Sequence, residues 1–267
     1  MGGAERNARK RRQEQAAQRA VAAARKSKSD RNKVIITVAV VVVIAAAVLA
    51  GVLITNSQKN EAAGVQIPVK NVSAELEAKR DGATVLVGKD TAKVTVDVYE
   101  DFLCPVCRTF EDQYATQLEQ KIQDGTVRVR YHMLTLLNNR SDPPGYSLDS
   151  ANAALLAADA GKFPAYHASL FGAQPEEGAR GYDKNQLIKL GQDLGITSPD
   201  FANGVNSGKY NQIVEDAYQK VSNDPALRQD FGNGQVGFGT PTVVVNGKIV
   251  QALNDPNWLN TVVSQAG

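Results

Sequence analysis

The sequence predicts an α/β domain in which a strand-and-helix framework is interrupted by a long helical block. Three observations carry this prediction. First, an alternating apolar run at 94–99 leads directly into a helix that begins at Cys104-Pro105-Val106-Cys107. Second, a stretch of helical character extends from about 147 to 232. Third, two short apolar runs after this block flank Asn246-Gly247, which is the strongest short signal for a β-hairpin.

The part before the helical block alternates between strand and helix. A helix is expected from Pro105 to about Gln123, and proline suits the first turn because its missing N–H would be unpaired there anyway. The apolar face of this helix repeats every four residues, at Phe110, Tyr114, Leu118 and Ile122. Strands are expected over 84–88, 94–101 and 126–137, and a short helix over 74–80.

The helical block and the end of the chain complete the domain. Helices are expected over 149–160, 183–194 and 209–222. Strands at 242–245 and 248–250 then form the predicted hairpin, and a last helix at 255–263 places Trp258 in the core. A domain from 83 to 267 is long enough to bury a substantial core.

Residues 34–54 form a second strong signal, because these 21 residues carry no charge. A helix of this length spans about 31 Å, close to the ~30 Å hydrocarbon thickness of a bilayer. Residues 1–33 hold 11 Lys or Arg against 3 Asp or Glu. Since positive flanks stay in the cytoplasm, we expect the N-terminus inside and the domain outside the cytoplasmic membrane. A cleaved signal peptide is the alternative, although the apolar run is longer than its usual hydrophobic region.

Charge divides the chain into two unlike parts. Residues 1–33 carry a net charge of +8, whereas 55–267 carry −6. We interpret the basic segment as a topology signal that contacts anionic lipid headgroups, and expect no nucleic-acid partner. The polar residues at 55–82 are interpreted as a tether between the transmembrane helix and the domain.

Cys104 and Cys107 are the only cysteines of the chain. Two thiols at this spacing, next to a strand–helix junction, are typical of a redox-active pair. Backbone N–H groups at a helix N-terminus favour an anion, so Cys104 should ionise more readily than a free thiol. A purely structural disulfide would close a very small loop and stabilise little. A zinc site would need two further ligands, for which only His132 and His167 are available, so we expect no metal and no cofactor.

Two motifs resemble those of DsbA-like thioredoxin-fold proteins. The segment from Tyr99 to Cys107 resembles their active-site entry, and Gly239-Thr240-Pro241-Thr242 resembles their cis-proline loop. The helical block is what distinguishes DsbA-like proteins from plain thioredoxins. The resemblance covers 83–267 and implies a thioredoxin-like fold with an inserted helical domain, here preceded by a single transmembrane helix. Membrane-anchored members of this kind are typical of actinobacteria.

The resemblance also implies roles for individual residues. Cys104 would be the exposed nucleophile, and Cys107, buried behind it, the resolving thiol. Pro241 would be cis and lie opposite the disulfide, while the Thr240 backbone would pair with an extended substrate strand.

The chain departs from the family pattern at two points. Many DsbA-like proteins carry an acidic residue six positions before the nucleophile, where this chain has Val98. Glu100 shares the strand parity of Val98 and is our candidate for proton transfer; the alternative is a solvated turn residue. The dipeptide between the cysteines is Pro-Val, without the histidine of strongly oxidising members, which predicts a less oxidising pair.

Our leading hypothesis is a membrane-tethered, extracytoplasmic thiol–disulfide oxidoreductase that oxidises cysteine pairs in exported proteins. The resemblance implies a membrane quinone-linked partner that reoxidises the dithiol. Cys-Pro-Val-Cys does not decide between this function and a reductase or disulfide isomerase on the same fold. A non-catalytic chaperone or assembly factor, using the groove beside Pro241, is the alternative from another class.

Overall fold

The computed structural model describes residues 9–11, 14–15, 18–19, 60–72, 76–232, 234–251, 253 and 255–266. The chain divides into two compact units, Met1–Ser57 and Gln58–Gly267. The described residues of the first unit are helical. The predicted transmembrane segment 34–54 lies outside the described residues, and among those that are described no helix has the length and apolar character to cross a membrane.

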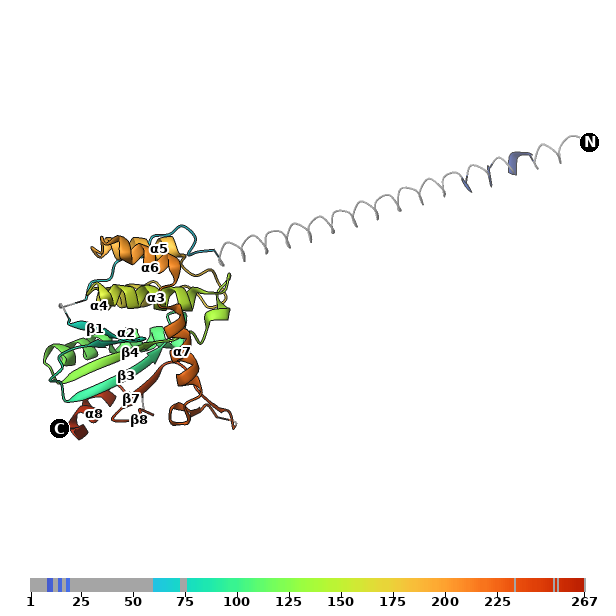
Figure 1. Ribbon diagram of the computed structural model, residues 1–267. Helices are drawn as coiled ribbons and strands as arrows, with labels where there is room; N and C mark the ends of the chain where they lie inside the picture. Colours follow the sequence, from blue (N-terminus) through green and yellow to red (C-terminus); the bar gives the residue numbers. More distant parts are fainter. Residues whose placement is uncertain are drawn as a thin grey trace, which may run out of the picture. The chain divides into compact units, whose positions relative to one another are not determined.

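A six-stranded sheet forms the centre of the second unit (Figure 1). Its strands follow the order β1-β2-β4-β3-β7-β8. β3 and β4 run parallel, with Val98 opposite Tyr131, and the other neighbouring strands are antiparallel. The strands are β1 (Ala78–Asp81), β2 (Thr84–Val87), β3 (Val94–Glu100), β4 (Val127–Met133), β7 (Thr242–Val245) and β8 (Lys248–Ile249).

Strict alternation in the two central strands fixes which residues enter the core. In both β3 and β4 every second residue is buried, beginning with the first. One face of each strand therefore packs against helices while the other stays partly solvated. Glu100, as the last residue of β3, falls on the buried face together with Val98.

Helix α2 (Pro105–Gln123) connects β3 to β4 and lies against the sheet. Its apolar stripe is the predicted one, with Phe110, Tyr114, Leu118 and Ile122 all buried. The last helix, α8 (Trp258–Ala266), brings Trp258 against α2, with ring centroids 6.3 Å from Phe110 and 5.8 Å from Tyr114. Trp258 is buried, which confirms it as a core anchor.

The helical insertion begins at α3 (Tyr146–Asp159), which contacts β1 and β2 on the sheet side and α4 to α7 on its other sides. Figure 1 shows α3 and α4 between the sheet and the pair α5–α6. The other α-helices of the insertion are α4 (Phe163–Gly172), α5 (Lys184–Asp193), α6 (Pro199–Ser207) and α7 (Asn211–Ser222). Two short 3-10 helices flank them, η1 (Asn138–Arg140) before α3 and η2 (Pro225–Leu227) after α7. α5 begins with a complete capping box between Asp183 and Gln186.

The start of the domain differs from the sequence prediction. Residues 78–81 belong to strand β1 rather than to a helix over 74–80, because they pair with β2 through a turn at Gly82, whose φ of +60° suits glycine. The predicted tether at 55–82 is also too long. Ile67 is buried in the core, and β1 adds a sixth strand to the sheet.

The end of the insertion differs as well. We expected helical structure up to 232, but the last helix of the block ends at Ser222. A two-stranded ribbon follows, formed by β5 (Gln229–Asp230) and β6 (Val236–Gly237). Its turn contains Gly232 and Gly234 with φ of +88° and +75°, a conformation that a helix does not accept.

Candidate active site

Cys104 occupies the N-cap of α2. Its backbone is extended, and Pro105 then supplies a φ that suits the first helical turn. The Cys104 Sγ accepts a hydrogen bond from the backbone N–H of Cys107 at 3.4 Å, so the helix end points its free amides at this sulfur. The expectation of an exposed nucleophile needs correction, since Cys104 is only 5 % exposed. The loop containing Thr240 covers it.

The two thiols have opposite tendencies to ionise. Hydrogen bonding to the side chains of Cys107 and Thr240 and to helix-end backbone amides lowers the pKa of Cys104 to about 7, although burial opposes it. Burial raises the pKa of Cys107 well above its ordinary value, and the neighbouring Cys104 raises it further. Both thiols are free. The arrangement therefore holds one sulfur ready as a thiolate and the other as a protonated thiol.

The loop before β7 lies against the dithiol. The Thr240–Pro241 peptide bond is cis, as the resemblance implies. The Cys104 thiol donates to the carbonyl oxygen of Thr240 at 3.3 Å, which joins residues 136 positions apart in the chain. The antiparallel pairing of β7 with β3 brings these two segments together, because Thr242 lies opposite Tyr99 at the strand ends that lead into both loops.

Glu100 is fully buried, so the alternative of a solvated turn residue is wrong. Its Oε1 is hydrogen-bonded to Nε2 of His167, which comes from α4 in the helical insertion. Burial raises the pKa of the Glu100 carboxyl well above its usual range, with a further increase from Cys104. Burial lowers the pKa of His167, so both partners favour their neutral forms.

Glu111 joins this pair from the buried face of α2. Burial raises the pKa of its carboxyl to about 8, and the nearby Glu100 adds to the shift. The ligand atoms of Glu100, Glu111 and His167 lie within 4.8 Å of one another. These three residues could contribute ligands to a metal ion, but a structural zinc site needs four, and His167 already bonds Glu100.

Asp101 holds the turn between β3 and α2. Its Oδ1 accepts hydrogen bonds from the Leu103 N–H at 2.8 Å and from the Ser147 hydroxyl at 2.7 Å. Its Oδ2 accepts from the Leu137 N–H at 2.8 Å. Burial raises the pKa of this carboxyl to about 6 despite these bonds. Asp101 therefore fixes the turn that presents Cys104, while the adjacent Glu100 faces the core.

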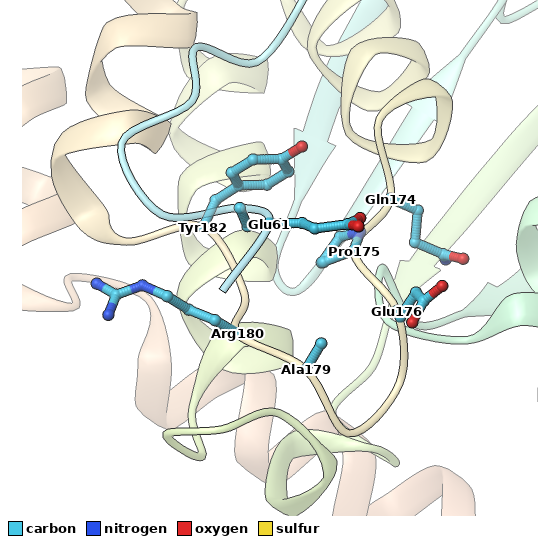
Figure 2. Close-up of a pocket in the computed structure, with 8 residues that line it drawn as sticks. Glu61, Gln174, Pro175, Glu176, Ala179, Arg180 and Tyr182 are labelled. Atoms are coloured by element: carbon cyan, nitrogen blue, oxygen red, sulfur yellow. The ribbon is translucent and has the colours of Figure 1, made fainter. Parts of the chain in front are cut away.

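Gln174 fastens the same turn from the insertion. Its side-chain amide donates to the carbonyl oxygens of Phe102 at 3.0 Å and of Cys104 at 2.9 Å. The segment that follows α4 also lines a pocket of about 190 Å³, together with Glu61 and Tyr182 (Figure 2). The insertion thus contacts the active-site turn directly.

The sequence did not indicate Glu111 or Gln174 as site residues, and it offered His167 only as a zinc ligand. Glu111 lies four residues after Cys107, which places it on the predicted apolar stripe of α2. His167 lies midway between Phe163 and Phe171 at four-residue spacing, on a face that is otherwise aromatic. A polar residue on a predicted core face was the available signal in both cases. Gln174 had no such signal, because it lies in a loop.

A family model described as Thioredoxin matches residues 80–265. Among curated proteins, the serine/threonine-protein kinase PknE of Mycobacterium tuberculosis is 29 % identical over 197 residues, which is 72 % of this chain. The chain spans about a third of the length of this relative, since the match covers 33 % of it.

Solved structures agree in fold and in the kind of protein. The reduced disulfide bond oxidoreductase DsbG of M. tuberculosis is 28 % identical, with a TM-score of 0.56, and the match covers 68 % of this chain and 86 % of that one. Reduced DsbA of the same organism is 26 % identical with a TM-score of 0.52, covering 70 % and 100 %. MdbA, a thiol-disulfide oxidoreductase from Corynebacterium matruchotii, is 25 % identical with a TM-score of 0.56, covering 70 % and 92 %. The chain therefore belongs to the thioredoxin family, in which it is a thiol–disulfide oxidoreductase of the DsbA type.

Proposed function

We propose that this oxidoreductase is tethered to the cytoplasmic membrane and oxidises cysteine pairs in exported proteins. The observation that carries the proposal is the asymmetry of the dithiol. The pKa of Cys104 is lowered to about 7, whereas that of the buried Cys107 is raised. In the oxidised pair, a client thiolate can attack the sulfur of Cys104, and the sulfur of Cys107 then leaves as a buried thiol.

The oxidising reaction has two exchange steps. A client thiolate attacks Cys104 of the Cys104–Cys107 disulfide, the S–S bond breaks, and Cys107 leaves with the electron pair and takes up a proton. A second client thiolate then attacks the client sulfur of the mixed disulfide. Cys104 leaves as a thiolate, which its lowered pKa favours, so the client gains a disulfide and the enzyme keeps the two electrons.

Glu100 is the proposed proton donor for the departing Cys107. It is buried beside the dithiol and close enough to raise the pKa of the Cys107 thiol. A thiolate in this apolar position is costly, so protonation by a neutral carboxyl favours opening of the disulfide. Thr240 and Pro241 would align the client as an extended strand beside Cys104.

The membrane location rests on the sequence before the domain. The uncharged segment 34–54 and the net charge of +8 over residues 1–33 support an anchor with its N-terminus in the cytoplasm. Protease treatment of intact cells tests this topology. The domain should be digested from outside while an N-terminal epitope tag stays protected; recovery of an intact, soluble domain from the cytoplasm would contradict it.

Continued turnover needs an oxidant, because each client leaves the enzyme reduced. We propose a quinone-linked protein of the same membrane as this partner. In membranes that contain such a partner, the steady-state fraction of oxidised enzyme should fall when quinone is depleted. An unchanged oxidised fraction would argue against this route.

The activity test compares the wild-type chain with Cys104→Ala on a reduced, unfolded client. The variant should lose client oxidation, because Cys107 alone cannot form the disulfide that a client thiolate attacks. Cys107→Ala should lose it as well, because it cannot form the Cys104–Cys107 disulfide that a client thiolate attacks. Full oxidation by Cys104→Ala would refute Cys104 as nucleophile.

A reductase or isomerase on the same site is a second candidate, favoured by the Cys104 pKa of about 7. Thioredoxin has a similar nucleophile pKa of about 7, whereas strongly oxidising DsbA has about 3.5. Equilibration with glutathione measures the reduction potential directly. A value near −270 mV, roughly that of thioredoxin, would favour reduction of clients over their oxidation.

A chaperone or assembly factor that does not use its thiols remains the rival from another class. The double variant Cys104→Ala with Cys107→Ala separates the two functions. Loss of client maturation in this variant supports the oxidoreductase, and full retention supports the chaperone.

A further inference from the structure

Three buried titratable side chains meet behind the dithiol, and each comes from a different element. Glu100 ends β3, Glu111 lies in α2, and His167 lies in α4. Their exposed fractions are 0 %, 7 % and 4 %, and the atoms that can carry a proton lie within 4.8 Å of one another. Two carboxyl groups this close in a buried site cannot both be ionised, so the cluster holds at least one mobile proton.

The hydrogen bonding of Glu100 is one-sided. Its Oε1 bonds His167 Nε2, its Oε2 is buried with no partner at hydrogen-bond geometry among the described residues, and the Glu111 side chain is near enough to lower its pKa. Glu111 Oε1 is likewise buried and has no described partner. Orphaned buried oxygens are costly unless a proton or a water reaches them. An open oxygen on each carboxyl is what stepwise proton transfer requires.

A small cavity lies on the outer side of this cluster. Its lining includes Glu111, His167, Tyr131 and Glu119, but not Glu100. The cavity measures about 30 Å³, and a water needs only about 10–15 Å³ of such space. Water can therefore contact His167 and Glu111, while Glu100 stays on the inner side.

We propose that protons pass between Cys107 and solvent along a route formed by Glu100, His167, Glu111 and this cavity. This route rests on the dithiol chemistry proposed above and names the residues that connect it to water. Glu100 is the group that exchanges a proton with Cys107. His167 is a positioning residue that holds Glu100 Oε1 and receives its proton at Nε2.

The proton balance can be followed when the disulfide forms. Cys107 attacks the Cys104 sulfur of a mixed disulfide, the bond to the client or glutathione sulfur breaks, and that sulfur leaves as a thiolate. The Cys107 proton moves to Glu100 Oε2 while Glu100 Oε1 gives its own proton to His167. His167 then passes a proton to cavity water, directly or through Glu111, and the cluster returns to its initial charge.

The charges around the cluster favour this path. The pKa of Glu111 is raised to about 8, so this carboxyl exchanges protons near neutral pH. On the dithiol side, Cys104 and Asp101 influence Glu100. On the cavity side, Lys70 acts on Glu111 and His167, and Glu119 acts on Glu111.

A single reaction with oxidised glutathione measures two steps separately, the attack by Cys104 and the closure by Cys107. Reduced full-length protein is mixed with oxidised glutathione, quenched with acid at successive times and analysed by mass. Attack by Cys104 gives the glutathione mixed disulfide, and closure by Cys107 then releases glutathione. Only the second step needs the proton of Cys107, so the first step serves as an internal control.

The informative variants are His167→Gln, which keeps a hydrogen-bonding group without a titrating ring, and Glu111→Gln. At neutral pH both should slow closure by at least about tenfold and leave the attack by Cys104 unchanged. Their closure rates should rise with pH and approach that of the wild type, since hydroxide can then take the proton. Ser150→Ala, a buried α3 substitution outside the cluster, should leave closure unchanged.

Two results would overturn the route. The first is wild-type closure in both variants at every pH, and the second is a uniform slowing of both steps without any change in pH profile, which a purely structural role would produce. His167→Phe guards against misfolding, because an aromatic ring fits among Phe102, Phe163 and Phe171. Circular dichroism should show that this variant is folded, and its closure should be as slow as that of His167→Gln. Closure at the wild-type rate in His167→Phe would also overturn the route. If the wild-type protein itself fails to react with glutathione, the proposed function fails instead.

Discussion

The side-chain nitrogen of Gln174 lies 2.9 Å from the carbonyl oxygen of Cys104, to which it donates a hydrogen bond. The same nitrogen donates to the carbonyl oxygen of Phe102 at 3.0 Å. Gln174 follows α4, so the helical insertion fixes the backbone on the N-terminal side of the nucleophile. The insertion also supplies His167 to Glu100. It therefore acts on the dithiol from two sides, which a plain strand-and-helix framework would not provide.

Gln174→Ala should loosen the active-site turn. The Phe102 carbonyl loses this side-chain donor, whereas the Cys104 carbonyl still accepts from the Arg108 N–H at 3.1 Å. We expect a loss of about 1–3 kcal/mol in the free energy of unfolding and a higher pKa of Cys104, since the turn holds its sulfur near the helix amides. Urea unfolding and the pH dependence of thiolate absorbance measure both effects. Gln212→Ala, at an exposed site on α7, is the control and should change neither.

Cys107→Ala should raise the pKa of Cys104 from its value of about 7, because hydrogen bonding to Cys107 is the largest cause of the lowering. The rate of alkylation by iodoacetamide at neutral pH should fall accordingly, and its midpoint should move to higher pH. Cys107→Ser, which retains a hydroxyl donor, should show a smaller shift. An alkylation midpoint that is identical in all three proteins would falsify this account of the thiolate.

The lowered pKa of Cys104 also predicts how the stability of the reduced protein depends on pH. Between about pH 7 and 8.5 the folded state has lost the Cys104 proton while the unfolded state still holds it, so stability rises with pH in this window. The gain is lost as the pH falls through 7. The difference in unfolding free energy between reduced and oxidised protein should therefore shift in favour of the reduced form by roughly 2 kcal/mol over this window. A difference that stays constant with pH would contradict it.

Local patterns were enough to predict the parts of this fold that depend on a single periodicity. The helix from Pro105 to Gln123 has the predicted bounds, because its apolar stripe and its first-turn proline agree. The hairpin at Asn246-Gly247 also agrees, since Asn246 adopts the positive φ that this turn requires. The Cys-x-x-Cys spacing and the Thr240-Pro241 loop together predict the family, because both motifs are contiguous in the chain.

Features that depend on contacts between distant segments could not be predicted in this way. Whether Glu100 is solvated depends on His167, which lies 67 residues away in the chain. The exposure of Cys104 depends on the loop at Thr240, and strand β1 forms only because β2 pairs with it. Parity alone placed Glu100 on the correct face of β3 but did not show what covers that face.

Glu111→Gln should stabilise the folded protein at neutral pH. The pKa of the Glu111 carboxyl is raised from 4.5 to about 8, so between these values the folded state holds a proton that the unfolded state has released. Stability therefore falls as the pH rises through this window, and the uncharged glutamine should remove a cost of a few kcal/mol, about 1.4 kcal/mol for each unit of pKa. Thermal unfolding of the oxidised protein at several pH values measures it. Glu215→Gln, an exposed control on α7, should keep the wild-type profile.

We expect clients to bind at exposed apolar side chains beside the dithiol. Phe231 and Val236, on the β5–β6 ribbon, are 57 % and 58 % exposed, and Val106 next to Cys104 is 61 % exposed. The Phe231 ring lies so close to Gly239 that a Cβ there would come within 2.7 Å of it, and Gly239 directly precedes Thr240. Exposed apolar side chains grouped at a site favour contact with unfolded polypeptide.

Phe231→Ala should therefore raise the KM for a reduced, unfolded protein client by about three- to tenfold, the effect of about 1 kcal/mol of lost apolar contact. Its exchange with glutathione, which is too small to reach the ribbon, should stay at the wild-type rate. Val65→Ala is the matched control, because Val65 is similarly exposed but lies against Gln186 of α5. Equal KM values for Phe231→Ala and Val65→Ala would place client binding elsewhere, whereas an increase confined to Phe231→Ala would assign it to the ribbon beside Thr240.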